Sequence, residues 1–337
     1  MTKTRKLLIT VLLLAATAAC VLFFFLRTAT TPEIVRLLPE GEMVLYANLK
    51  PVHLFWQANK PLEIEGEYHD FINQTGIDFE RDLDEVAMSR RETPDGRDTE
   101  SSEIFVGRFD RPRLETYLAK ISSTQEDYSA RKIFVVPHEG HTVRVTILSA
   151  DRIAVTNMAA ADVMHEMIDA DKKLPAGPSL VQNFHDKVPL GSLAWAIVRV
   201  GSNQKNQSPG GWSFDFLENT VTVASLRYKG DLLVHADVIA GTEREAKQVV
   251  DSAASFVSMY RTVALSVGTK GSDPDVKAAI DSIMVQQKEN IATFSATLPQ
   301  RMLKKLFSEA QSQAAQTPTP VPAPPSGSSS SSGKRKR

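Results

Sequence analysis

The sequence contains a single cysteine, Cys20, and that residue lies inside a long apolar run. The rest of the chain therefore cannot form an internal disulfide, and it offers no cysteine thiolate as a nucleophile or metal ligand. A domain of this length does not need disulfides when its hydrophobic core is large enough. The stability of the fold should therefore come from apolar burial.

The sequence also lacks the common catalytic and nucleotide-binding motifs. It contains no G-x-G-x-x-G string and no G-x-x-x-x-G-K-[ST] string. Ser179 and Ser192 follow glycines, but neither has the second glycine of a G-x-S-x-G nucleophile elbow. Asp215 and Asp237 stand isolated in expected strands and indicate no acid–base pair. We therefore predict no catalytic residue, no cofactor-binding residue and no cofactor.

Neither sign of charge dominates the chain. Its 39 basic and 40 acidic residues give a formal net charge of −1. No global field would attract a nucleic acid or an acidic substrate, so no nucleic-acid partner is expected.

The most distinctive segment is the uncharged run from Leu7 to Leu26, LLITVLLLAATAACVLFFFL, which contains neither proline nor glycine. A helix of about 20 apolar residues is long enough to cross a bilayer. Lys3, Arg5 and Lys6 precede the run and only Arg27 closely follows it, a bias that keeps the N-terminus in the cytoplasm. We predict a single-pass protein of the inner or cytoplasmic membrane, with the bulk of the chain extracytoplasmic, in the periplasm.

Two other interpretations of this run stay open. Ala16-Thr17-Ala18 is typical of a signal-peptide cleavage site, and Cys20 could be the lipidated residue of a lipoprotein signal. Either cut would leave the apolar residues 21–26 on the mature N-terminus. The sequence therefore favours a retained anchor.

Changes in composition divide the chain into segments. Residues 1–6 form a cytoplasmic stub, 7–26 the transmembrane anchor and 27–32 a short tether. A first folded unit covers 33–174 and a second covers 179–312. Residues 313–337 are rich in proline and serine and end in Lys-Arg-Lys-Arg, a composition that predicts a disordered tail with a basic end.

Hydrophobic patterns and turn residues predict an α+β fold. Each unit should have a mostly antiparallel sheet, with helices packed on one of its faces. Cap residues mark several helix starts: Asp78, Asp110 with Pro112, Asn157, and a Thr242–Glu245 capping box. The expected strands are 43–49, 87–90, 103–109, 133–136, 142–148, 152–156, 193–200, 220–228, 232–240, 284–287 and 292–298. The expected helices are 52–72, 111–121, 157–171, a short one at 184–188, one from 242 broken at 268–274, 276–283 and 301–313.

Several of these signals together resemble a class of uncharacterised bacterial exported proteins with a single N-terminal membrane anchor. The shared features are a Leu-Pro-Glu-Gly turn feeding the strand at 38–49, a Thr-Gly-Ile-Asp turn at 75–78 with Asp82 after it, a strand-to-helix turn at Asn157, and a closing Thr297-Leu298-Pro299. The resemblance covers most of residues 33–310. It implies an extracytoplasmic location and this type of fold, and it supplies no catalytic residues.

One short string has the composition of a metal site. His138-Glu139-Gly140-His141 places two histidines beside a carboxylate. Zinc proteases need histidines at i and i+4 on a helix, whereas this spacing is i+3 in an expected hairpin turn. We therefore predict no metal site, and keep His138 and His141 as weak candidates beside the interpretation as a solvated turn.

Alternating aromatic residues mark a second candidate. On an extended strand, Trp212, Phe214 and Phe216 point to one face, where they would contact a partner or pack into the core. The acidic group Asp78, Asp82, Asp84 and Glu85 does not match a calcium loop, and helix caps with a solvated face explain it.

These observations favour a membrane-anchored extracytoplasmic domain that binds or scaffolds without catalysis. Its expected partners are the membrane itself, crossed by a single span, and an envelope protein or an anionic polymer. The alternative is an exported hydrolase or a metal-dependent enzyme with an unrecognised site.

Overall fold

The computed structural model describes residues 31–51, 53, 67–93, 98–138, 140–201, 219–267, 274–302 and 305. The predicted anchor at 7–26 and the predicted tail at 313–337 lie outside these residues. Within them, no helix has both the length and the apolar character that a membrane span requires.

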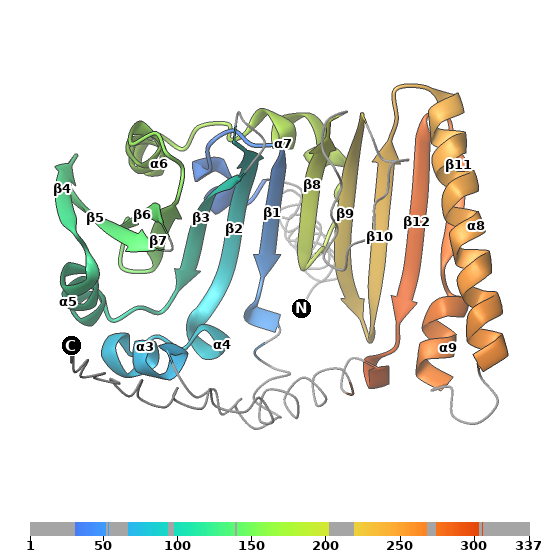
Figure 1. Cartoon of the computed structure of the whole chain (residues 1–337), viewed down its shortest axis with the longest axis horizontal. Helices are drawn as coiled ribbons and strands as arrows, with labels where there is room; N and C mark the ends of the chain where they lie inside the picture. Colours follow the sequence, from blue (N-terminus) through green and yellow to red (C-terminus); the bar gives the residue numbers. More distant parts are fainter. Residues whose placement is uncertain are drawn as a thin grey trace, which may run out of the picture.

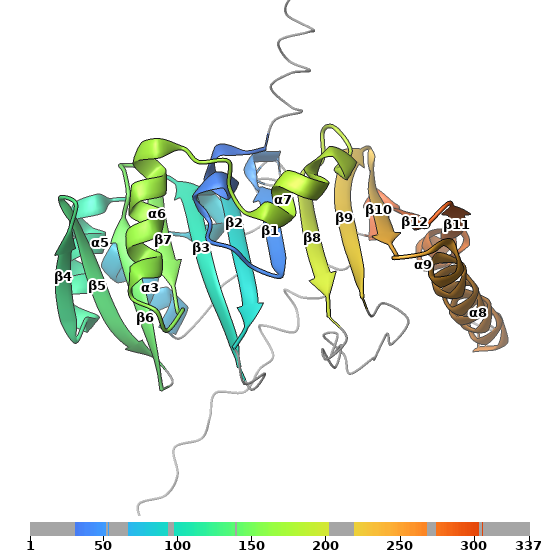
Figure 2. The same cartoon turned by 90° about the horizontal axis from the view of Figure 1, so that it is seen from above.

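The described strands form one 12-stranded sheet in which every neighbouring pair is antiparallel (Figure 1). Its order is β11-β12-β10-β9-β8-β1-β2-β3-β7-β6-β5-β4. Figure 2 shows β4 at one end of the sheet and β11 at the other. The strands are β1 (Met43–Asn48), β2 (Leu83–Glu92), β3 (Thr99–Gly107), β4 (Thr124–Tyr128), β5 (Arg131–His138), β6 (His141–Ile147), β7 (Arg152–Thr156), β8 (Ala194–Val200), β9 (Thr220–Lys229), β10 (Asp231–Ile239), β11 (Met284–Lys288) and β12 (Ile291–Leu298).

Helices pack against both faces of the sheet. One face, which we call the η1 face, packs against η1, α6 and α7. The opposite face, which we call the α8 face, packs against α3 and α5 near β5 and against α8 near β12. The helices are η1 (Glu33–Leu37), α3 (Glu67–Thr75), α4 (Phe79–Asp82), α5 (Arg111–Ile121), α6 (Asp162–Lys173), α7 (Ser179–Phe184), η2 (His185–Lys187), α8 (Glu243–Val267) and α9 (Pro274–Asp281).

The α+β fold and its antiparallel sheet are confirmed, but two details differ from the prediction. The strands of both predicted units join a single sheet, because β1 pairs with β8 from Met43↔Val198 to Ala47↔Ala194. The helices lie on both faces of that sheet rather than on one. A sheet buried on one side only would leave apolar side chains such as Phe105 and Phe134 on the α8 face in water, and α5 covers them instead.

The two halves of the sheet share a connectivity. Strands β1, β2 and β3 form a meander, α5 follows, and the chain returns to β3 through β7. Likewise β8, β9 and β10 form a meander, α8 follows, and the chain returns to β10 through β12. The first half inserts four strands after its helix and the second half inserts two.

The core is strongly uneven between these halves. The largest cluster lies on the η1 face, where Ile104, Trp195 and Ile197 of the sheet meet Leu37 of η1 and Met164 of α6. A second cluster sits between α5 and β5–β7. Around β10 and β12, by contrast, the described core cluster is small and consists of Val238, Val249 and Ala292, and the other buried apolar residues there are alanines at the end of β10 and in α8 and α9. The second half therefore leaves more of its sheet exposed to solvent.

Most of the predicted helix starts are confirmed. The Asp110 side chain accepts a hydrogen bond from Arg113 N at the start of α5. Thr242 and Glu245 exchange hydrogen bonds as a capping box at the start of α8. Asn157 was predicted wrongly as a cap: α6 begins later, at Asp162, and Asn157 Oδ1 instead accepts a 2.6 Å hydrogen bond from Ser101 N of β3.

Candidate binding face

The structure confirms a hairpin at the two histidines. His138 and His141 are cross-strand partners at the end of β5 and β6. His141 Nε2 lies 3.4 Å from Asp98 Oδ2 in the loop before β3, and both side chains are about half exposed, at 52% and 51%. Among the residues that the structure describes, no group of three or more histidine, cysteine or acidic residues could hold a metal ion. A metal at His138 and His141 stays a sequence-based candidate.

The other predicted contact cannot be placed. Trp212, Phe214 and Phe216 lie outside the described residues, within the span between β8 and β9. Their role in partner contact stays a prediction.

The acidic residues around α4 serve the fold. Asp78 caps α4 by accepting a hydrogen bond from Glu80 N. Asp82 is buried, accepts from Asp78 N at 3.0 Å and pairs with Arg81 at 2.7 Å and Arg108 at 3.5 Å. Burial works to raise the pKa of Asp82, but the hydrogen bonds from Arg81 and Asp78 N and the two arginine charges outweigh it and hold that pKa below its usual value.

This arrangement makes part of the stability depend on pH. Because the pKa of Asp82 is lower in the folded chain, its contribution is complete above about pH 4, where the unfolded carboxyl is ionised, and is lost as pH falls through the folded pKa. Replacing Asp82 with asparagine should lower the free energy of unfolding at pH 7 by about 1–3 kcal/mol. Denaturant unfolding from pH 7 to pH 2 should show this difference shrinking below about pH 4. Asp84→Asn, which alters a more exposed carboxyl 3.9 Å from Lys50, is the control and should change little; equal losses in both variants would contradict the assignment.

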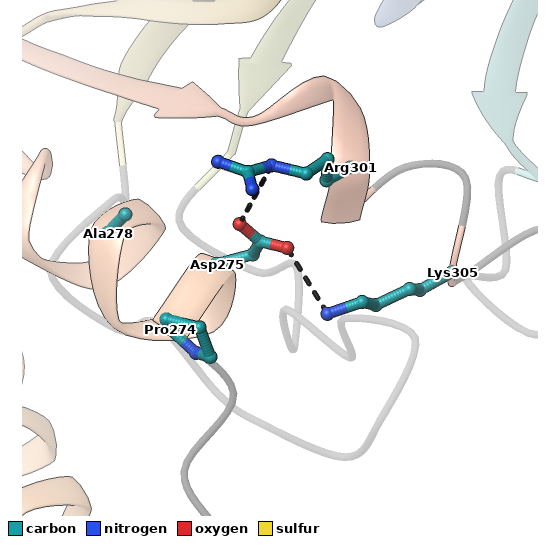
Figure 3. A pocket seen from close by; sticks show the side chains of 5 residues that line it. All are labelled: Pro274, Asp275, Ala278, Arg301 and Lys305. Atoms are coloured by element: carbon teal, nitrogen blue, oxygen red, sulfur yellow. Dashed lines mark hydrogen bonds and ion pairs between the residues drawn. The ribbon is translucent and has the colours of Figure 1, made fainter.

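One cavity of about 490 Å³ lies beside α9 (Figure 3). Asp275 is only 7% exposed and stands between two cations, with Lys305 Nζ at 3.2 Å and Arg301 Nε at 3.7 Å from its carboxylate oxygens. The two cations neutralise the buried carboxylate. This pocket therefore ties the residues after β12 to α9, and its charges are used within the chain.

A second cavity, of about 220 Å³, lies where η1 meets the joint between the predicted units. The Arg36 guanidinium donates to the carbonyls of Pro175 at 2.6 Å and Leu174 at 2.7 Å. The Glu40 carboxylate accepts from the backbone N–H and the hydroxyl of Ser179, each at 2.8 Å. Both charged groups form hydrogen bonds within the chain. These bonds connect the segment between the two predicted units to η1 and the residues that follow it.

A partly solvated part of the described sheet lies farther along the η1 face. We call it the open face and define it by the side chains that β10, β12 and β11 place there. Helices α8 and α9, which contact β11 and β12, stand together in front of the sheet in Figure 1, and α8 packs on the opposite face through Val249 with Val238 and Ala292. The open face consists of six partly buried residues, Leu233, His235, Asp237, Thr293, Ser295 and Thr297, and two exposed residues, Met284 and Gln286.

Three polar side chains are in contact across this face. Thr293 Oγ1 on β12 donates to Asp237 Oδ1 at 2.7 Å, and Asp237 Oδ2 lies 3.3 Å from His235 Nε2. His235 and Asp237 are two residues apart on β10, so both point to the same side of the sheet. The expectation that Asp237 stands isolated was therefore wrong. A His-x-Asp spacing on a strand was the sequence signal that could have found the pair.

An aromatic cluster borders the open face. Trp195 of β8 is opposite both Tyr46 of β1 and Ser225 of β9, and its ring centre lies 5.8 Å from Tyr46 and 5.4 Å from His185. Burial, together with the charge of Glu85, raises the pKa of Tyr46, whose hydroxyl donates to Glu85 at 3.1 Å. Burial lowers the pKa of His185 despite the nearby Asp186. These groups form a buried, largely aromatic cluster on the same sheet face, with β9 between it and the polar residues of β10.

Comparison with known proteins gives a distant likeness in structure. No protein family matches the sequence, and no curated protein matches it. The fold is similar to crystal form III of TP0453 of Treponema, with a TM-score of 0.45 and 10% identity, over 83% of this chain and 99% of that one. Crystal forms I and IV of the same protein give TM-scores of 0.44 and 0.43 at 9% and 8% identity. These values carry no functional information to this chain.

Proposed function

We propose that this chain is a membrane-tethered extracytoplasmic domain that binds a component of the cell envelope without catalysing a reaction. The observation that carries the proposal is the open face of the sheet. Polar side chains from neighbouring strands are held there in fixed positions by the sheet, while the other half of the same face is buried under η1, α6 and α7. A rigid, partly solvated surface of this kind is suited to recognising a partner.

The tether places this surface close to the bilayer. Residues 27–32 separate the predicted anchor from the fold, and six extended residues reach about 20 Å at most. The chain has no slack after them, because Ile34 and Val35 of η1 are already buried in the core. The partner therefore lies near the membrane surface, as expected for an envelope protein or an anionic polymer.

A photo-crosslinking experiment in cells tests the proposal. A photoreactive residue in place of Gln286, which is exposed on the open face, should give a reproducible crosslinked product. The matched control places the same residue at Glu115 on α5, at the far end of the molecule, where little crosslinking is expected. An alkaline-phosphatase reporter fused after Gln316 should be active if the predicted orientation holds.

Two results would contradict this function. Products of equal yield at Gln286 and Glu115 would show that the open face recognises nothing in particular. Absence of any product at Gln286, with the full-length protein present in the membrane fraction, would remove the binding role.

A further inference from the structure

Three polar side chains are neighbours where β9 meets β10. Ser225 on β9 is directly opposite His235 on β10. Arg227 follows Ser225 by two residues on β9, so it projects from the same face and pairs across the sheet with Leu233. Directly opposite side chains have Cβ atoms about 4.5–5.5 Å apart, and diagonal neighbours such as Arg227 and His235 about 7–8 Å apart. The three side chains therefore lie close together on one face of the sheet.

Two of these groups are buried without a hydrogen-bond partner among the residues that the structure describes. Ser225 is only 2% exposed, and its hydroxyl makes no hydrogen bond. The Nε of Arg227 is also buried and makes none. No carboxylate of the described residues pairs with the Arg227 guanidinium, although most other buried ionic groups here, such as Asp82 and Asp275, have partners. Leaving buried polar groups unpaired is costly, so an external acceptor at this place would relieve that cost.

The third side chain is held in position by its neighbours. Asp237 fixes the Nε2 side of the His235 ring, and Thr293 in turn holds Asp237. Asp237 is opposite Val223, on the side of His235 away from Arg227, so the carboxylate does not occupy the space between Arg227 and Ser225. Nδ1, the other ring nitrogen, faces away from Asp237 and can donate to a ligand when both ring nitrogens carry a proton.

From this arrangement we infer that Arg227, Ser225 and His235 form a binding site for an oxyanion, which is a carboxylate or phosphate group of the ligand. The planar fork of an arginine matches the two oxygens of such a group, a hydroxyl supplies a further donor, and the doubly protonated imidazolium of His235 adds an N–H and a positive charge. Trp195, opposite Ser225 on β8, closes the site on its apolar side. The inference rests on the proposed binding function and gives the partner a chemistry, since the surface it binds should carry anionic groups.

The site can be tested on the full-length protein in a non-ionic detergent. Titration with inorganic phosphate and, separately, with acetate should raise the unfolding temperature above that in sodium chloride of the same ionic strength. Binding of phosphate alone would identify a phosphate ligand, and binding of acetate alone would identify a carboxylate. In Arg227→Gln the apparent Kd of the bound anion should rise at least tenfold.

Two further variants separate binding from folding. Arg199→Gln removes another arginine from the same sheet face, opposite Val221, and should leave anion binding unchanged. Ser225→Ala removes only the unpaired hydroxyl, so it should fold and still weaken binding severalfold. Unchanged affinity in both Arg227→Gln and Ser225→Ala, or no stabilisation of the unmodified protein by either anion, would overturn the inference.

The crosslinking experiment distinguishes this inference from the function on which it rests. If Arg227→Gln loses anion binding and also loses the product formed at Gln286, both stand. If the product persists unchanged in Arg227→Gln, the partner does not use the oxyanion site and the inference fails while the binding function survives. If no product forms but Arg227→Gln still abolishes anion binding, the proposed function fails and the site remains.

Discussion

Replacing Gly107 with alanine is expected to lower the free energy of unfolding by about 3 kcal/mol or more. Gly107 ends β3 where the main chain of Asp82 crosses it. A Cβ atom there would lie 2.2 Å from the Asp82 carbonyl oxygen and 3.1 Å from Phe109 Cζ. The Asp82 oxygen cannot withdraw freely, because it accepts a 2.9 Å hydrogen bond from Arg108 N.

The control for this substitution is Gly201→Ala at the end of β8, where an added Cβ meets no atom within 4 Å. Its effect should stay within about 0.5 kcal/mol. Denaturant unfolding of both variants measures the difference. Similar stability in the two would show that β2 and β3 can separate at this end without cost, against the close approach described above.

The second large effect is expected at η1. Leu37→Ala should lower the free energy of unfolding by about 2–5 kcal/mol, because it empties a fully buried position in the largest core cluster. The result matters beyond packing, since η1 is the first element of the fold after the predicted tether. If the segment is part of the core, as its burial shows, its loss should destabilise the whole sheet and not only the N-terminus.

Leu190→Ala provides the matched change at a surface position. Leu190 is 42% exposed, against 1% for Leu37, and its truncation should cost less than about 0.5 kcal/mol. Thermal and denaturant unfolding followed by tryptophan fluorescence would report both, because Trp195 belongs to the same cluster as Leu37. If Leu37→Ala lowers the free energy of unfolding no more than Leu190→Ala does, the packing of η1 against the sheet contributes little to stability.

Local signals in the sequence predicted the local structure well. The helix at 111–121 matches α5 at both ends, because Asp110 and Pro112 define its start by a chemistry that needs no distant partner. The strand at 152–156 matches β7, and the hairpins of β5–β6, β9–β10 and β11–β12 follow from short turns between apolar runs.

Strand β4 is an element that such local signals do not predict. Its sequence, Thr-Gln-Glu-Asp-Tyr, has no apolar alternation, because four of its five side chains are exposed at the edge of the sheet. Its conformation comes from pairing with β5 across Ser129 and Ala130, both with positive φ. A polar edge strand buries few side chains, so its sequence lacks the apolar alternation by which a strand is predicted. Its charged side chains disfavour pairing with the strands of other molecules.

The candidate site could not be predicted from the sequence, for a different reason. Ser225, Arg227 and His235 are ordinary residues of two strands, and only the register of β9 against β10 makes Ser225 and His235 opposite neighbours. A shift of that register by one residue would place the Ser225 and Arg227 side chains on the opposite face from His235, and the site would no longer form. The pairing of β1 with β8 is likewise invisible locally, because the two strands lie far apart in the chain.

That central pairing has a consequence for how the protein matures. If the protein is exported as proposed, its chain crosses the membrane from the N-terminal side and delivers β1 before either of its neighbours. Val44 meets Ser89 of β2 early, whereas its other partner, Ile197 of β8, emerges only after the whole first half has crossed. During that interval the edge of β1 that later pairs with β8 presents unsatisfied peptide groups to its surroundings. The proposed export route therefore predicts that the yield of native protein depends on how fast the second half of the chain follows the first.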